Sequence, residues 1–223
     1  MVPRMTGAWD WAEALRQRHF GGLLLERYRL EPVTESEYWS VLVPDWRPHW
    51  PAEVYFDFSR LRDREQRERI DRLACARCAA DLVEQWRVLD GDRQVAMFSG
   101  RQTSPSEFLM THAQVAPEAQ GRGIYSAILR LMLSYTEDLG FETVTSEHSP
   151  TNNAVLVPKL RAGFLITGLV LQAAWGPSVT LTYFHDPRQR AAFAFRAGDA
   201  SLTPELIDAG FVGMDTLRRQ FGR

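Results

Sequence analysis

The chain has 223 residues, of which 45% are hydrophobic, 24% charged and 11% aromatic. This is the composition of a globular protein that can bury its own core, and it excludes a disordered or low-complexity chain. The 26 basic residues face 28 acidic ones, so the net charge is −2 and no basic field is present to attract a nucleic acid. Lys159 is the one lysine, since every other basic residue is an arginine.

Hydrophobic periodicity and turn residues predict a mixed α/β chain. A capping box, in which the side chains of Thr34 and Glu37 satisfy free N–H groups of a first helical turn, predicts a helix start. In chain order we predict a helix at 9–19, a strand at 23–30, a helix from 35 to 43, a strand at 54–58, a helix at 61–79, antiparallel strands at 82–89, 94–101 and 107–115, a helix at 124–139, a strand at 141–147, a helix at 152–162, a hairpin of strands at 164–172 and 178–184, and helices that begin after Asp186 and Thr203.

The predicted elements belong to one main domain. The strand–helix–strand order after residue 107 requires at least one parallel pairing in an otherwise antiparallel sheet. We therefore expect an α/β domain at 23–184 with a mixed, largely antiparallel central sheet flanked by helices. The segments 1–22 and 185–223 are expected to be helical additions, the second packed on the same domain.

Several classes of site and location are disfavoured by simple patterns. Cys75 and Cys78 form a single C-x-x-C without further ligands, which favours core packing over a metal site, and we expect no metal. Residues 1–10 contain no signal-like apolar run, so we expect a cytoplasmic protein. The uncharged segment 164–184 could span a membrane by length, but its β-branched residues and its Gly-Pro step favour a buried hairpin, and we expect no membrane partner.

The main chemical signal lies at 115–126, where a strand, a glycine turn and a helix start coincide. Gly121 and Gly123 let the backbone approach a ligand, and the free N–H groups of the following helical turn favour an anion such as a diphosphate. The segment lacks the third glycine of a dinucleotide fingerprint and the Gly-Lys-Ser/Thr ending of a P-loop, which sets both classes aside. A glycine turn before a helix also occurs as a plain connection, so this motif alone leaves the function open.

The segment Gln120-Gly121-Arg122-Gly123-Ile124 resembles the Gln/Arg-x-x-Gly-x-Gly/Ala signature of the GNAT acyltransferase superfamily, and the chain departs from it with Tyr125 in the last place. A second stretch, in which Asn152-Asn153 lead into a short helix that ends at Gly163-Phe164, is also similar to the family, as is the element order over 23–184. The resemblance implies the GNAT fold and an acyl-CoA N-acyltransferase, usually an N-acetyltransferase that uses acetyl-CoA as co-substrate.

The resemblance also implies where the acyl-CoA lies. It would follow the strand that ends at Val115 and place its pyrophosphate on backbone N–H groups of the glycine turn and first helical turn. Tyr125 would make its contact through its N–H while its side chain points away, and Asn152 or Asn153 would hold the pantetheine amide. The implied cofactor-binding residues are Ala113, Val115, Gln120, Gly121, Arg122, Gly123, Tyr125, Ser126, Asn152, Asn153 and Lys159.

Direct attack of an amine on a thioester requires a base for the amine and an acid for the leaving thiolate. The tyrosine that commonly serves as the acid in the family is absent, and Lys159 stands in its place. An ammonium there could protonate the thiolate, but we expect an ordinary exposed or phosphate-contacting lysine. The candidates for the base are Glu107, His112 and His148, of which His112 has the better intrinsic pKa.

Two functions of different classes remain open. The first is an N-acyltransferase for a primary amine of a small molecule, amino acid or peptide, and the second is an acyl-CoA-binding regulatory or scaffold module that has lost catalytic residues. The near-neutral charge disfavours a nucleic-acid acceptor, and a homodimer is left open. The acceptor is not determined by the sequence, because variable loops such as 45–51 and 102–107 build acceptor pockets in this fold. Trp46, His49 and Trp50 in the first loop either line a substrate entrance or pack onto the core.

Overall fold

The computed structural model describes residues 10–41, 64, 82–173 and 176–198. The chain forms two compact units, Met1–Thr182 and Tyr183–Arg223. Several expectations lie outside the described residues: the strand at 54–58, all of the helix at 61–79 except residue 64, the helix after Thr203, and the side chains of Trp46, His49, Trp50, Cys75 and Cys78.

The first unit is built on a mixed sheet, as the sequence predicts. In the described residues the strands follow the order β1-β2-β3-β4-β5-β6-β8-β7. β5 and β6 are parallel, whereas β1–β2, β2–β3, β3–β4, β4–β5 and β7–β8 pair in antiparallel fashion. The strands are β1 (Leu23–Leu24), β2 (Tyr28–Pro32), β3 (Val83–Asp90), β4 (Arg93–Ser104), β5 (Glu107–Val115), β6 (Thr143–His148), β7 (Leu165–Gln172) and β8 (Gly176–Phe184).

The single strand predicted at 23–30 is wrong, because the chain reverses within it. Leu25 and Glu26 adopt positive φ angles of 52° and 57°, which form a tight turn between β1 and β2. Such a turn usually carries Gly or Asn, and neither is present here. The sequence of 23–30 therefore predicts a single strand, although the segment contains a hairpin.

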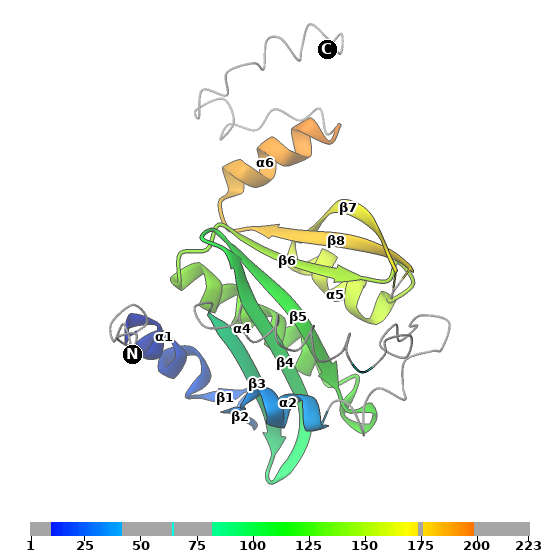
Figure 1. Ribbon diagram of the computed structural model, residues 1–223. Coiled ribbons are helices and arrows are strands. Elements are labelled where there is room, and N and C mark those ends of the chain that lie inside the picture. Colours follow the sequence, from blue (N-terminus) through cyan, green and yellow to red (C-terminus); the bar gives the residue numbers. More distant parts are fainter. Residues whose placement is uncertain (1–9, 42–63, 65–81, 174–175, 199–223) are drawn as a thin grey trace, which may run out of the picture. The chain divides into compact units, whose positions relative to one another are not determined.

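Helices cover both faces of the sheet in the first unit (Figure 1). α1 (Asp10–Phe20) and α4 (Ile124–Asp138) share one face, where the Phe20 ring stacks on Trp86 of β3 at 4.2 Å and meets Tyr135 of α4 edge-on at 4.8 Å. α2 (Glu35–Val41) lies on the opposite face, where its buried Tyr38 packs against Met97 of β4. Helices thus pack on both faces of the sheet.

The predicted capping box starts α2. The backbone N–H of Thr34 donates to the Glu37 carboxylate at 2.8 Å, and the N–H of Glu37 donates to the Thr34 hydroxyl at 3.3 Å. These reciprocal bonds satisfy donors that the first turn of any helix leaves free.

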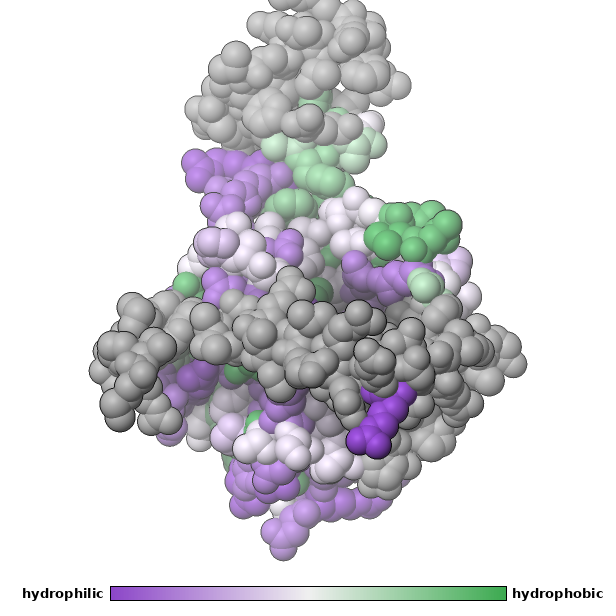
Figure 2. Space-filling view, viewed as in Figure 1, coloured by the Kyte–Doolittle hydropathy of each residue, from purple (hydrophilic) through white to green (hydrophobic). Residues whose placement is uncertain are grey.

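β7 is the last strand of the sheet and carries an exposed apolar edge. Leu169 and Leu171 are 69% and 80% exposed, and Figure 2 shows a hydrophobic patch over this hairpin.

Among the described helices none is both long and apolar enough to cross a membrane. The segment 165–184 forms the predicted hairpin.

The second unit contains α6 (Pro187–Arg196). Asp186 caps this helix, because its carboxylate accepts the backbone N–H of Arg188 at 2.8 Å and proline occupies the first turn. The predicted Asp-Pro helix start is therefore confirmed.

Candidate functional site

The site begins with two parallel strands that separate. β5 and β6 are in register only from Glu107 opposite Thr143 to Leu109 opposite Thr145. Beyond that point they diverge toward their carboxyl ends (Figure 1). The pairing of β5 with β4 also shifts, since Ser99 faces His112 while Gly100 faces Met110, which leaves Thr111 as the extra residue of a bulge. Past Leu109, β5 is no longer paired with β6.

A cavity of about 920 Å³ lies between the separated strands. It is lined by β5 from Met110 to Val115, by the end of β6, and by the first turns of α4 and α5 (Asn153–Ala162). This volume is at the upper end of the range of about 300–1,000 Å³ for small-molecule sites, so the cavity has room for a large ligand.

The start of α4 presents unsatisfied donors to this cavity. Gly123 is the N-cap residue, with φ 77°, and, having no side chain, it makes no capping hydrogen bond. Gly121 also has a positive φ, 75°, so both glycines adopt a backbone conformation that other residues rarely take. Because the first turn contains no acidic residue, the N–H groups and the positive end of the helix dipole remain available to an anion.

The start of α5 is open in the same way. Asn152 is its N-cap residue and lines the cavity, yet its side chain makes no capping hydrogen bond. Pro158 lies inside the helix and has no N–H to donate to the carbonyl of Ala154 one turn earlier. Ala154 and Pro158 both line the cavity, so a side-chain amide and a backbone carbonyl are offered there to a ligand with amide groups.

Lys159 forms part of the cavity wall but is only 1% exposed. Its Nζ donates to the Ser146 hydroxyl at 2.7 Å, approaches the sulfur of Met110 at 3.6 Å and lies 4.6 Å from the centre of the Phe164 ring. Burial lowers the pKa of Lys159 to about 7. The expectation of an exposed lysine is therefore wrong, because α5 directs this side chain into the space between β5 and β6.

His148, at the end of β6, is held in its neutral form. Burial, together with the positive charge of Lys159, lowers the pKa of His148 to about 3. Its Nε2 is buried and has no hydrogen-bond partner among the described residues. A buried polar atom of this kind normally binds a ligand or a water molecule.

His112 of β5 also lines the cavity, and a residue of α2 holds its ring. Its Nδ1 is hydrogen-bonded to the hydroxyl of Tyr38 at 2.6 Å, and the two rings meet edge-on with centres 5.9 Å apart. Burial raises the pKa of Tyr38 far above its usual value, so its hydroxyl remains protonated. The imidazole is thus oriented by α2, an element far from it in the sequence.

The comparisons with solved structures place this architecture among known folds. No family model matches the sequence, and no curated protein matches it by sequence. The ribosomal-protein-S18-alanine N-acetyltransferase of Escherichia coli aligns over 70% of this chain and 93% of its own, with 13% identity and a TM-score of 0.51. A GCN5-related N-acetyltransferase from Kribbella flavida aligns over 72% and 99%, with 16% identity and a TM-score of 0.52. The spermidine/spermine N-acetyltransferase SpeG of Vibrio cholerae aligns over 76% and 99%, with 13% identity and a TM-score of 0.51. The chain has the GNAT fold.

The GNAT fold brings most of the predicted site residues to the cavity between β5 and β6. The predicted residues that line it are His112, Ala113, Val115, Gln120, Gly121, Gly123, Tyr125, Ser126, His148, Asn152 and Lys159. Their assigned roles remain predictions.

Three predicted residues do not line the cavity. Glu107 lies at the opposite end of β5, where its carboxylate accepts the Thr103 hydroxyl at 2.6 Å. Arg122 turns back to donate to the carbonyl of Glu118 at 3.0 Å, and Asn153 is the first residue of α5 rather than its cap. The GNAT fold of this chain therefore gives no reason to assign these three side chains to the site.

The sequence did not indicate lining residues such as Met110, Ala154 and Pro158, nor Tyr38 and Ser146, which contact His112 and Lys159. Tyr38 of α2 contacts His112 of β5, and Ser146 of β6 contacts Lys159 of α5, so both pairs form only in the tertiary structure. A signal existed for Tyr38 alone, since it is the first apolar residue after the capping box and had to face the sheet.

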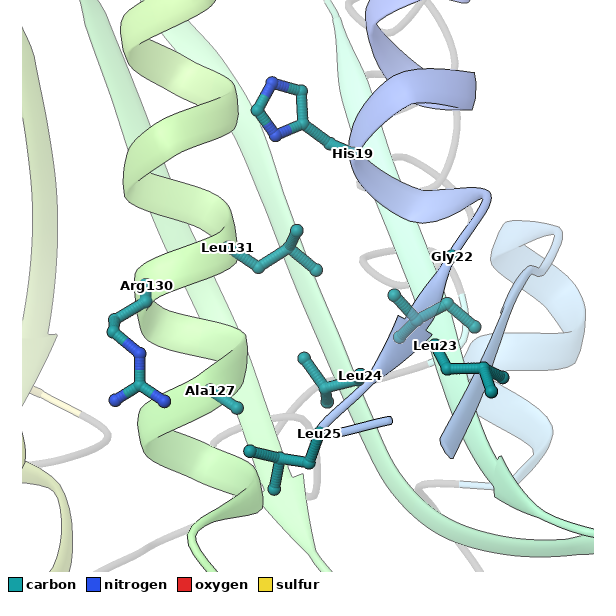
Figure 3. Close-up of a pocket in the computed structure, with 9 residues that line it drawn as sticks. His19, Gly22, Leu23, Leu24, Leu25, Ala127, Arg130 and Leu131 are labelled. Atoms are coloured by element: carbon teal, nitrogen blue, oxygen red, sulfur yellow. The ribbon is translucent and has the colours of Figure 1, made fainter. Parts of the chain in front are cut away.

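A smaller cavity, of about 230 Å³, lies between α1, β1 and α4 (Figure 3). Its wall is mostly leucine, with His19 and Arg130 at the edge, and the His19 imidazole is already bonded to Asp138 at 2.7 Å. Polar groups do not converge in it, so we do not place the functional site there.

Proposed function

We propose that this protein is an acyl-CoA-dependent N-acetyltransferase, which transfers the acetyl group of acetyl-CoA to a primary amine of a small molecule, an amino acid or a peptide. The observation that carries the proposal is the gap between β5 and β6, which ends on the uncapped start of α4. An extended ligand that ends in a diphosphate matches this arrangement of backbone groups.

The residues of the gap fit such a donor. Backbone groups of β5 from Met110 to Val115 are offered to the amides of the pantetheine arm, and the N–H groups around Gly121 and Gly123 are offered to the pyrophosphate. Asn152 and the carbonyl of Ala154 supply further partners for the arm.

His112 is the base in this proposal. The Tyr38 hydroxyl holds its Nδ1, and its imidazole lies on the cavity wall, where it is placed to accept a proton from the acceptor amine. His148 is a poorer base, because a pKa of about 3 leaves its imidazole with little affinity for a proton. The leaving thiol has a pKa of about 8.5 by analogy with cysteine, so its departure as a thiolate depends little on a strong acid.

The similar structures support an amine as acceptor. By their names, one acts on the alanine of ribosomal protein S18 and another on spermidine and spermine, so both protein and small-molecule amines are acetylated on this fold. The acceptor of this chain is proposed at that level of detail only.

Calorimetry with acetyl-CoA and a free-thiol assay with a panel of amines test the proposal. We expect binding, and continuous turnover to free thiol, beyond one equivalent per protein, that depends on an amine. Replacing Gly121 and Gly123 by alanine strains the positive-φ turn by about 1–2 kcal/mol per residue and misdirects its N–H groups, so we expect about tenfold or more loss of affinity. Gly140, at the other end of α4, has a φ of 86°, and Gly140→Ala imposes the same strain away from the cavity with unchanged affinity.

The outcomes separate the two functions. Binding without release under any amine supports the acyl-CoA-binding module, and absence of binding by the wild-type protein overturns both functions. Equal losses of affinity in the Gly140→Ala and Gly121/Gly123 variants would show that the turn has no special role.

A further inference from the structure

The amine of Lys159 is the most unusual group in the cavity. It is the only lysine side chain of the sequence, and its side chain is buried on the cavity wall. Its described contacts are a hydroxyl, a thioether and an aromatic face, from Ser146, Met110 and Phe164, and none of these is anionic.

A purely structural role does not account for this placement. Lysines at a protein surface usually extend the charged end into water, and a buried ammonium without a counterion is costly. A leucine or methionine would fill the same space without that cost. The reactivity of the amine, rather than the space that the side chain fills, therefore distinguishes lysine from the apolar residues that would fit here.

We propose that Lys159 is itself an acyl acceptor, which takes the acyl group from an acyl-CoA in the same cavity and becomes an Nε-acyl-lysine. This inference rests on the proposed use of acyl-CoA. It adds a covalent modification site and a second kind of acceptor to the activity.

The step is balanced without any further reagent. The neutral amine attacks the thioester carbonyl, the new C–N bond forms and the C–S bond breaks. The sulfur leaves as a thiolate and takes the proton that the amine loses, so the products are an amide and a free thiol. Because the amine donates a hydrogen to Ser146, the nitrogen lone pair of its neutral form remains free for the attack.

Burial favours both the reactant and the product of this step. The pKa of Lys159, about 7, gives a substantial neutral fraction at neutral pH, whereas an exposed lysine is almost wholly charged. The amide product carries no charge at any pH, so acylation ends the cost of burying an ammonium that no anionic side chain among the described residues contacts.

The test is to incubate the full-length protein with acetyl-CoA and no amine acceptor, and to measure the intact mass and the peptide masses with time. We expect one acetyl group on Lys159 and one free thiol for each. Because the sequence contains one lysine, the modification is distinguished at once from acetylation of the α-amino group. Lys159→Arg keeps a positive charge but lacks the nucleophile, and it should acquire no acetyl group on its side chain.

A matched control provides an exposed lysine on the same helix. Arg161 is exposed and lies two residues after Lys159, so Arg161→Lys places a second amine on α5 outside the cavity. We expect Lys159 to react about tenfold or more faster than the introduced lysine at pH 7, because the latter is almost fully protonated. Urea should abolish the preference.

Each other outcome counts against the inference. If acetyl-CoA binds and external amines are acetylated while Lys159 stays unmodified, the inference fails and the proposed function stands. If the introduced lysine or the α-amino group is acetylated in preference to Lys159, the modification is unselective and the inference fails. If calorimetry detects no binding of acetyl-CoA, the proposed function fails and the inference fails with it.

Discussion

His112 and Tyr38 form one unit at the scale of single residues. The proposed base is held by a buried tyrosine hydroxyl at 2.6 Å, so removing the hydroxyl removes a contact that orients the imidazole and favours one tautomer. His112→Ala should lower kcat about 100-fold or more with unchanged affinity for acetyl-CoA. Tyr38→Phe keeps the ring and should lower kcat about tenfold and move the pH profile of kcat/KM, since it perturbs the base indirectly.

The matched control for these variants is His19→Ala. His19 pairs with Asp138 beside the smaller cavity, so its loss should leave turnover unchanged. Full turnover in His112→Ala would exclude it as the base. An unchanged pH profile in Tyr38→Phe would show that the hydroxyl does not act through the imidazole.

Lys159 makes stability depend on pH in a definite direction. Its pKa is about 7 in the folded state and near 10.5 in the unfolded chain, so between these values the unfolded state binds more protons. The stability contributed by the neutral buried amine is therefore present above pH 10.5 and is lost as the pH falls toward 7. Relative to Lys159→Met, the wild-type protein should lose roughly 2 kcal/mol of unfolding free energy between pH 9 and pH 7.

Urea unfolding of both proteins at the two pH values measures this difference. The methionine variant is the reference because it fills a similar volume without a titrating group. A constant difference between the two proteins over this pH range would mean that the pKa of Lys159 is not shifted. The proposed acylation of Lys159 would then be supported only by the position of its amine in the cavity.

At the scale of elements, a buried carboxylate joins α1, β3 and α4. Glu84 accepts the Arg16 guanidinium at 2.8 Å, the Tyr135 hydroxyl at 2.6 Å and the Trp86 indole N–H at 2.9 Å, and it is 2% exposed. Glu84→Gln replaces one acceptor oxygen by an NH₂ donor that faces other donors, and it removes the buried negative charge that pairs with Arg16. We expect a loss of about 3 kcal/mol in unfolding free energy.

Glu13→Gln is the control, because it removes the exposed partner of the same arginine. The Glu13 side chain is 73% exposed and its pair with Arg16 spans 3.2 Å, so the loss should be below about 1 kcal/mol. Denaturant unfolding followed by tryptophan fluorescence reports both values. Similar losses in the two variants would show that α1 is not held by the buried carboxylate.

Elements were predictable where their sequence signals are local. The stripe at 124–139 and the glycine after it predict α4 closely, because amphipathic period and helix caps act over a few residues. The β1–β2 hairpin was missed since its turn uses Leu25 and Glu26, whose positive φ angles have no local sequence signal. Local sequence patterns therefore do not predict a turn whose backbone conformation is determined by residues elsewhere in the chain.

At the scale of the whole molecule, the candidate site depends on a feature that no single element contains. The cavity exists because β5 and β6 pair over three positions and then diverge, with α4 and α5 starting at the opening. A pattern of strands and helices predicts that two strands are neighbours, but not where their pairing stops. The glycine turn was visible in the sequence, whereas the gap into which it opens was not.

The sequence by itself determined the order of most elements, the caps of α2 and α6, the glycine turn at 120–123 and the resemblance to the GNAT superfamily, because each depends on spacing along the chain. Only the tertiary structure decided which candidate residues meet. It separated Glu107 from the cavity, joined Tyr38 to His112 and buried Lys159 against Ser146. The physical reason is that burial, and with it the pKa of Lys159 and of His148, is produced by atoms from distant parts of the chain.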